Sequence, residues 1–239
     1  INMKALLFAA GKGTRLKPFT DEHPKALAKV NGIALLERNI KYLQGYGIND
    51  FVINIHHFGG QILAFLAEND YFGANIEISN EHEELLETGG GLLFSRKFLE
   101  NEKSFLIMNV DILTDLNITN FVKIHELKGA VITLAVSDRE SSRKLMFNEK
   151  MFLKGWRNLT TNKKKVVGGI FKLRELAFSG IHCVNSEIFD KFTRTGSFSI
   201  MDEYMELMKE DIIIGYQHTA SLVDVGRPES IVEAERIFK

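Results

Sequence analysis

The amino-acid sequence predicts an α/β fold, a doubly wound and mostly parallel sheet with helices on both faces. Two observations support this prediction. Short apolar runs alternate with segments whose apolar residues recur at helical spacing, from the start of the chain to Val136. The runs are continuous rather than alternating, which is typical of strands buried on both faces. A chain of 239 residues is long enough for one large domain of this Rossmann-like kind.

The first half of the chain contains the regular alternation. The run at 4–9 predicts a buried strand that leads into a loop at Gly11. Leu36, Ile40 and Leu43 then mark a helix, and glycines at 45 and 47 end it. The elements expected next are strands at 51–55, 75–79, 104–109 and 131–136, a helix around residues 62–66 and a helix at 91–98.

The alternation breaks after Val136. Residues 139–176 are rich in Lys, Arg and Asn, contain the single tryptophan Trp156, and predict hairpins and loops. Strands are expected again at 177–184 and 221–225, followed by a last helix at 228–238. No repeat or Gly/Ser linker divides the chain. We therefore expect a single domain over residues 1–239, with residues 137–176 as an inserted β-hairpin or flap region within it.

Composition excludes several classes of partner. The formal net charge of −1 generates no field that would attract nucleic acid or an anionic membrane. Cys183 is the single cysteine and cannot form an internal disulfide. The longest apolar stretch is too short to cross a bilayer, and no secretory signal pattern opens the chain. We expect a cytoplasmic monomer or homodimer without nucleic-acid or membrane partners.

Residues 9–15 read Ala-Ala-Gly-Lys-Gly-Thr-Arg and directly follow the first predicted strand. Glycines and small residues let a backbone approach an anion closely and turn its N–H groups toward it. A plain turn with solvated charges is the alternative. Leu16 stands where a dinucleotide fingerprint needs its third glycine, which disfavours a dinucleotide-dependent oxidoreductase. Five cations concentrate in this segment and favour a polyphosphate ligand: Lys12, Arg15, Lys17, Lys25 and Lys29.

Carboxylates also follow two apolar runs. Asp111 comes after the strand predicted at 104–109, and Asp224 comes after Leu222 and Val223. Carboxylates at the carboxyl ends of strands can converge on the crevice where ligands bind, and a pair of hard oxygen ligands suits Mg²⁺. Taken singly, each Asp is also explained as the cap of a turn.

The chain resembles the sugar-phosphate nucleotidyltransferases. The resemblance covers nearly the whole sequence and keeps the order of the family's motifs, among them Gly-x-Gly-Thr-Arg-Leu-x-Pro at 11–18. The further matching strings are His-Pro-Lys at 23–25, Leu-Glu-Thr-Gly-Gly-Gly at 86–91, Asn-Val-Asp at 109–111, Phe-Ser-Gly at 178–180 and Val-Asp-Val-Gly at 223–226. Within the family, the chain is most similar to the single-domain N-acetylmuramic acid α-1-phosphate uridylyltransferases of bacteria.

The resemblance implies a role for each matching position. Arg15 would hold the departing pyrophosphate and Lys25 the α-phosphate, and Asp111 and Asp224 would bind Mg²⁺. Thr88 is also explained as the N-cap of the next helix. The expected nucleotide-binding residues are Ala10, Gly11, Gly13, Thr14, Glu81, Glu87, Thr88 and Gly89, and those near the sugar phosphate are Asn109, Ser179 and Gly180.

The implied reaction joins a nucleoside triphosphate, UTP by this resemblance, to N-acetylmuramic acid 1-phosphate and releases pyrophosphate, a step of peptidoglycan recycling. The family's Glu-Lys-Pro sugar motif is absent from residues 172–177, which matches the short uridylyltransferases. A mannose 1-phosphate guanylyltransferase, which shares the phosphate machinery, is the alternative enzyme. A non-catalytic regulatory protein that binds nucleotide sugars is the alternative of another class. The lactyl carboxylate of the muramic acid would favour a cation in the flap region, where the candidates are Lys163, Lys164, Lys165, Lys172 and Arg174.

Overall fold

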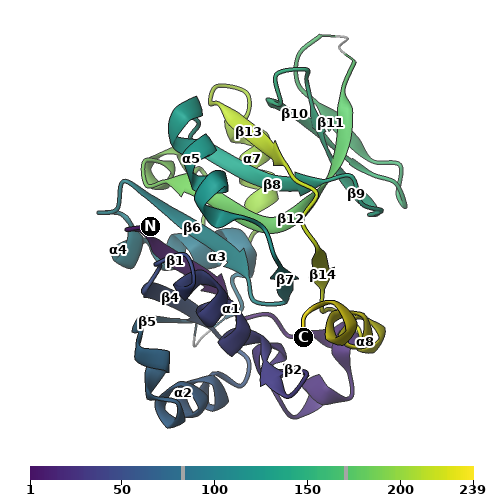
Figure 1. The fold of residues 1–239 in the computed structure, drawn as a ribbon. Coiled ribbons are helices and arrows are strands. Elements are labelled where there is room, and N and C mark those ends of the chain that lie inside the picture. Colours follow the sequence, from purple (N-terminus) through teal and green to yellow (C-terminus); the bar gives the residue numbers. More distant parts are fainter. Residues whose placement is uncertain (82–83, 170–171) are drawn as a thin grey trace.

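The computed structural model describes residues 1–81, 84–169 and 172–239 and confirms the doubly wound α/β fold (Figure 1). The central part of the main sheet has seven strands, which are parallel to one another except β12, which runs antiparallel to its neighbours β6 and β8. The strand order is β5 (Asn75–Asn80), β4 (Asp50–Ile55), β1 (Lys4–Phe8), β6 (Ser104–Asn109), β12 (Arg174–Asn185), β8 (Ile132–Ser137) and β13 (Ile213–Gln217).

Helices cover both faces of this sheet because successive strand residues point to opposite sides. In β1, Leu7 packs with α1 (Leu35–Gln44), α2 (Gly59–Glu68) and α5 (Ile118–Lys128) in one core. Its neighbour Leu6 faces the other core. The helices of that second core are α3 (Glu87–Phe94), α4 (Arg96–Leu99), α6 (Ile188–Lys191) and α7 (Ile200–Leu207).

A third, smaller core lies next to the phosphate loop and contains Leu16, Val30, Val223 and Ala234. It joins the phosphate loop to the end of the chain, and α8 lies beside β2 and β14 at the lower right of Figure 1. The elements here are the 3-10 turns η1 (Thr14–Leu16), η2 (Phe19–Asp21) and η3 (Lys25–Leu27), the strands β2 (Lys29–Val30), β3 (Ile33–Ala34), β7 (Ile112–Thr114) and β14 (Leu222–Asp224), and α8 (Pro228–Ile237). A further 3-10 turn, η4 (Asp70–Gly73), precedes β5.

The region expected to form a flap contains three antiparallel strands, β9 (Arg143–Phe147), β10 (Leu153–Asn158) and β11 (Lys164–Val166). They project from the upper right of the molecule in Figure 1. The strand β9 pairs with the first residues of β12, so the flap continues the main sheet instead of standing apart from it. Residues 170 and 171 of the predicted region lie outside the described residues.

Several predicted elements differ from those observed. The helix expected at 91–98 begins earlier, at Glu87, and breaks at Ser95 into α3 and α4. The Ser95 hydroxyl donates to the carbonyl of Gly91 at 2.8 Å, a back-bond that competes with the helical ladder. The strand expected at 221–225 is β14, which pairs with β7 outside the main sheet. No helix was predicted at α5 or α7 and no strand at β13. No described helix is long and apolar enough to span a membrane.

Candidate active site

A cavity of about 430 Å³ opens at the carboxyl ends of β1, β4 and β6. After β1 the chain proceeds outward through β4 to β5, and then returns to the other side of β1 as β6. Ligands of open α/β sheets bind at such a switch in strand order. The cavity is lined by Phe8, Ala9, Ala10, Gly11, Gly13, Thr14, Arg15, Lys25, Asn54, Leu85, Glu87, Thr88, Asn109, Val110, Asp111 and Gly226. We call it the nucleotide cavity.

The two glycines of the phosphate loop have different reasons to be glycine. Gly13 has a left-handed φ of 60°, and a Cβ there would lie 2.9 Å from the Cβ of Lys25. Its carbonyl also accepts the hydroxyl of Thr20 at 2.9 Å. A Cβ on Gly11 would meet no atom of the described residues within 4 Å. Gly13 is therefore required by the fold, whereas the free space beside Gly11 lets a ligand approach the backbone.

Lys25 lies in a buried position and forms an ion pair with Asp111 across the floor of the cavity. The Lys25 side chain is 10% exposed and the Asp111 side chain 21%. A short 3-10 turn, η3, carries Lys25, while Asp111 follows β6, so the fold brings the two residues together from separate layers. The cation expected to hold the α-phosphate and a carboxylate expected to bind the metal are thus in direct contact.

Arg15 and Asp224 meet at Gly226. A Cβ on Gly226 would lie 2.8 Å from an oxygen of Asp224 and 2.9 Å from a guanidinium nitrogen of Arg15. Only glycine leaves both side chains this room. The N–H of Val225 donates to the carbonyl of Asp111 at 2.8 Å, which ties the end of β14 to the end of β6. The sequence predicted that Asp224 follows a strand of the main sheet. It instead ends β14, which belongs to a separate two-stranded sheet.

The pKa of Asp224 is raised above its ordinary value. Burial is the main cause and repulsion from Asp111 the second, while Lys25, Arg15 and Arg139 oppose the rise. Asp224 is nevertheless exposed, and it lines a second cavity that adjoins the nucleotide cavity. Two carboxylates thus lie close enough to repel each other, in a setting where a cation would be stabilised.

The glycines of the Leu-Glu-Thr-Gly-Gly-Gly string allow close packing. A Cβ on Gly89 would lie 2.3 Å from the ring of Phe198, and one on Gly90 would lie 2.2 Å from the carbonyl oxygen of Gly196. A Cβ on Gly91 would meet the buried carboxylate of Glu81 at 2.6 Å. Helix α3 is therefore pressed against the segment before α7 and against the end of β5.

Glu81 and Gly89 were expected to bind the nucleotide, but neither is among the residues that line the cavity. Glu81 is 2% exposed, and its carboxylate accepts from the Asn54 amide and from the N–H of Leu86 at 2.9 Å. The N–H of Gly89 donates to the carbonyl of Phe198 at 2.8 Å. Both residues hold the wall of the cavity in place, and Asn54 provides the polar surface that faces inward.

Glu87 and Thr88 do line the cavity. Glu87 has a left-handed φ of 56°, an uncommon conformation for a residue with a side chain and one that collects at functional sites. The suggestion that Thr88 caps α3 is wrong, because the cap position is Leu86. The Thr88 hydroxyl instead accepts the N–H of Ile200 at 3.0 Å and joins α3 to α7.

Of the residues expected near the sugar phosphate, Asn109 lines the nucleotide cavity. Ser179 is fully buried, and its hydroxyl is hydrogen-bonded to His218 at 2.8 Å, away from that cavity. Gly180 has a φ of 74°, and a Cβ there would come within 3.3 Å of the Asn109 amide. The atom nearest to that Cβ would be Cγ1 of Ile112, at 2.6 Å, so Gly180 makes room mainly for Ile112, while Ser179 belongs to the interior.

Of two further cavities, the larger adjoins the first, and the smaller adjoins the larger. The larger, of about 1160 Å³, shares Arg15 and Gly226 with the nucleotide cavity and is also lined by Asp224. We call it the acceptor cavity. The third, of about 450 Å³, lies between the flap and α7 and has Trp156 and Phe178 in its wall. Arg143 and Lys144 line both the acceptor cavity and this flap cavity.

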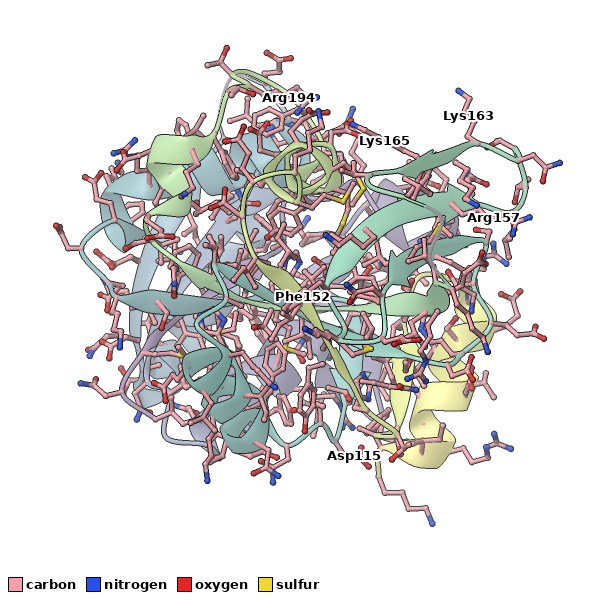
Figure 2. All side chains as sticks on the ribbon, turned by 90° about the horizontal axis from the view of Figure 1, so that it is seen from above. Asp115, Phe152, Arg157, Lys163, Lys165 and Arg194 are labelled. Carbon is pink, nitrogen blue, oxygen red and sulfur yellow. The ribbon has the colours of Figure 1, made fainter. Side chains whose placement is uncertain are left out.

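The sequence motifs did not identify Arg139, Arg143, Lys144 or Arg227, all of which line the acceptor cavity. The signal for Arg139 was its place just after the strand predicted at 131–136, where a parallel strand reaches the ligand-binding edge. Of the flap cations considered from the sequence, Lys165 lines the flap cavity, and Lys163 points away from the body of the molecule in Figure 2.

Comparison with known proteins is consistent with this geometry. Residues 4–145 match the family model described as nucleotidyl transferase. The chain is 30% identical to the N-acetylmuramate alpha-1-phosphate uridylyltransferase of Neisseria meningitidis serogroup B over 98% of both chains. It is 25% identical to the mannose-1-phosphate guanyltransferase of Gibberella zeae, covering 99% of this chain and 64% of that protein.

Among solved structures, a putative glucose-1-phosphate thymidylyltransferase from Bacillus anthracis superposes with a TM-score of 0.83 at 17% identity. The superposition covers 98% of this chain and 94% of that one. At this identity the likeness supports the fold alone.

Proposed function

The chain belongs to the nucleotidyl transferase family and is a sugar-1-phosphate nucleotidyltransferase; we propose that its substrates are UTP and N-acetylmuramic acid 1-phosphate. The observation that carries this choice is the 30% identity, over the full length of both chains, to a protein with that activity in its name. The reaction would form a bond between an oxygen of the sugar phosphate and the α-phosphorus of UTP. The bond from that phosphorus to the β-phosphate oxygen would break, and pyrophosphate would leave.

The residues around the phosphate loop suit the donor side of this reaction. Phosphoryl-type transfer requires aligned reactants and cations near the crowded negative charge, with little covalent chemistry from the protein. The free space at Gly11 admits the triphosphate to the backbone N–H groups. Arg15, at the edge shared by the nucleotide and acceptor cavities, would grip the departing pyrophosphate, and Lys25 would hold the α-phosphate.

Asp111 and Asp224 fit a divalent cation. They bring two hard oxygen ligands together, and a cation would relieve the repulsion that helps to raise the pKa of Asp224. No group of three or more acidic, histidine or cysteine side chains among the described residues could hold a metal, so phosphate oxygens and water would complete the shell. When bound, Mg²⁺ would neutralise charge on the phosphates. In its absence Lys25 neutralises Asp111.

The apolar part of the nucleotide cavity would hold the base. Phe8 and Leu85 contribute apolar surface, while Asn54 and Thr88 contribute polar groups. A pocket that forms hydrogen bonds with uracil leaves buried polar groups unpaired when the wrong base enters, and this penalty can discriminate strongly. The rigid packing of α3 behind this wall would keep those groups in place.

The lining of the flap cavity favours an acidic sugar as the substrate. Trp156 and Phe178 present aromatic surface against which a sugar ring can pack, and Arg143 and Lys144 connect this cavity to the acceptor cavity. These cations would attract the lactyl carboxylate of N-acetylmuramic acid. Mannose 1-phosphate lacks such a group. A mannose 1-phosphate guanylyltransferase remains the second candidate, and the observation in its support is the 25% identity to the Gibberella protein.

A substrate panel tests the proposal. Pyrophosphate release is measured for UTP, GTP, CTP and dTTP against the 1-phosphates of N-acetylmuramic acid, N-acetylglucosamine, glucose and mannose. We expect the highest kcat/KM for UTP with N-acetylmuramic acid 1-phosphate. A higher value for GTP with mannose 1-phosphate would replace the substrates and leave the reaction class unchanged. N-acetylglucosamine 1-phosphate is the matched control, because it differs from the muramic acid substrate only by the lactyl group.

A further inference from the structure

The acceptor cavity is strongly basic. Its lining has five cationic side chains, Arg15, Arg139, Arg143, Lys144 and Arg227, against the two carboxylates of Glu140 and Asp224. It opens from the nucleotide cavity at Arg15 and Gly226, next to the carboxylates expected to bind the metal. A second anionic substrate that must meet the α-phosphate would therefore enter through this cavity.

Among these cations, Arg139 is the one whose side chain donates two hydrogen bonds to the described part of the chain. Its guanidinium donates to the carbonyl of Phe178 at 2.8 Å and to the carbonyl of Glu140 at 3.3 Å. The Lys144 ammonium in turn donates to the carbonyl of Arg139 at 2.5 Å. Arg139 lies two residues after the end of β8, in the connection from β8 to β9, and these hydrogen bonds fix its half-buried side chain there.

The charge of Arg139 is incompletely compensated. No carboxylate lies within 4 Å of its guanidinium among the described residues, and its Nε is buried without a hydrogen-bond partner there. Burial lowers the pKa of Arg139, and only the more distant Asp224 counteracts this effect. A partly buried cation without an ion-pair partner is costly, and an anion that enters the cavity would supply that partner.

We infer that Arg139 binds the phosphate of the sugar 1-phosphate and so orients its attacking oxygen toward the α-phosphorus. This inference rests on the proposed transfer to a sugar 1-phosphate. A planar guanidinium fixed at two points suits a phosphate, because it can donate two parallel N–H groups to two oxygens. The flap lysines Lys163 and Lys164 are exposed and line none of the three cavities described above, so they cannot take this role.

The test compares Arg139→Gln with Arg236→Gln, which removes an exposed arginine of α8 that lines none of these cavities. Initial rates of pyrophosphate release are measured with both substrates varied. We expect Arg139→Gln to raise the KM for the sugar 1-phosphate at least tenfold while the KM for the nucleoside triphosphate changes less than twofold. Arg139→Lys should recover part of the loss, and Arg236→Gln should behave like the wild type.

An unchanged KM for the sugar 1-phosphate, or an equal rise in both KM values, would overturn the role of Arg139. If the wild type releases no pyrophosphate with any sugar 1-phosphate, the proposed function fails by itself. The role of Arg139 is then decided by calorimetric titration of N-acetylmuramic acid 1-phosphate into protein with Mg²⁺ and α,β-methylene-UTP. At least tenfold weaker binding to Arg139→Gln supports the role, and equal or undetectable binding to both proteins refutes it. Thermal unfolding of each variant shows whether it is folded.

Discussion

The ammonium group of Lys25 is ion-paired with the carboxylate of Asp111, although 86 positions separate them in the chain. Each of the two residues is expected to bind a different partner when substrates arrive, Lys25 the α-phosphate and Asp111 the metal. In the free protein each neutralises the other, which lowers the cost of keeping two charges in a largely enclosed place. The ion pair therefore keeps both side chains charged, so that each is ready to bind its expected ligand.

The first prediction concerns the two aspartates. Asp111→Asn or Asp224→Asn should reduce turnover by roughly 10²-fold or more, because each removes a hard ligand and a charge from the candidate metal site. Activity is measured by pyrophosphate release across a series of Mg²⁺ concentrations. Asp190→Asn, which changes an exposed aspartate paired with Arg96, is the control. Full activity of either active-site variant, or undiminished wild-type turnover in excess EDTA, would exclude this role.

The second prediction separates Arg15 from Lys25. Arg15→Lys should impair the enzyme by about tenfold or more although the charge is kept, because an ammonium cannot replace the planar fork that grips two phosphate oxygens. Lys25→Ala should mainly lower kcat. The constants kcat and kcat/KM are obtained from rates at saturating and limiting nucleotide, with Arg236→Lys as the matched conservative control. Wild-type behaviour of Arg15→Lys under both conditions would contradict the geometric role of Arg15.

The third prediction concerns the glycines of α3. Gly90→Ala should destabilise the protein by about 1–3 kcal/mol, because its Cβ would meet the carbonyl oxygen of Gly196 at 2.2 Å. Gly60→Ala in α2 is the matched control, since a Cβ there has no atom within 4 Å in residues 1–81, 84–169 and 172–239. That change should be neutral or stabilise by roughly 0.4–1 kcal/mol. Urea unfolding of the two variants measures both effects, and equal stabilities would show that α3 does not need its close contact.

The fourth prediction is a loss of stability in acid. His182 is buried, its ring nitrogen is hydrogen-bonded to the Tyr204 hydroxyl at 2.8 Å, and burial lowers its pKa to about 3. The unfolded chain, in which a histidine has its ordinary pKa near 6.5, binds the proton more readily below that pH. The contribution of His182 to the free energy of unfolding is therefore nearly constant above about pH 6.5, and it declines as the pH falls toward the folded-state pKa of about 3.

By this linkage the lowered pKa of His182 should reduce the free energy of unfolding by roughly 2–3 kcal/mol at pH 4.5 relative to pH 7. His182→Gln should flatten the pH dependence of the free energy of unfolding between pH 7 and 4.5, even if the variant is less stable at neutral pH. Urea unfolding at several pH values measures the slope. His57→Gln, at a half-buried position outside the sheet, is the control. Parallel pH profiles for the wild type and His182→Gln would show that His182 is not responsible.

Much of the fold was predictable because local patterns determine it. The runs at 4–9 and 104–109 are continuous and apolar, and the structure contains strands at Lys4–Phe8 and Ser104–Asn109. Helix α5 was not predicted although its sequence carries local signals for a helix. The buried residues Ile118, Phe121 and Val122 recur at helical spacing, and Asn117 and Gly129 cap the two ends. The break at Ser95 was also missed, because it depends on hydrogen bonds to Gly91 and to Ser79 of a neighbouring strand.

The sequence by itself determined the family and the residues of the phosphate loop, because a contiguous string such as residues 11–18 carries its chemistry locally. Tertiary structure alone decided that Glu81 and Gly89 support the cavity wall, since their hydrogen-bond partners come from distant segments. It also decided that Arg139 lines the acceptor cavity together with Arg15 and Asp224. Spacing along a chain cannot reveal such a neighbour, because β8 and β14 are placed by their pairing partners and not by their own sequence.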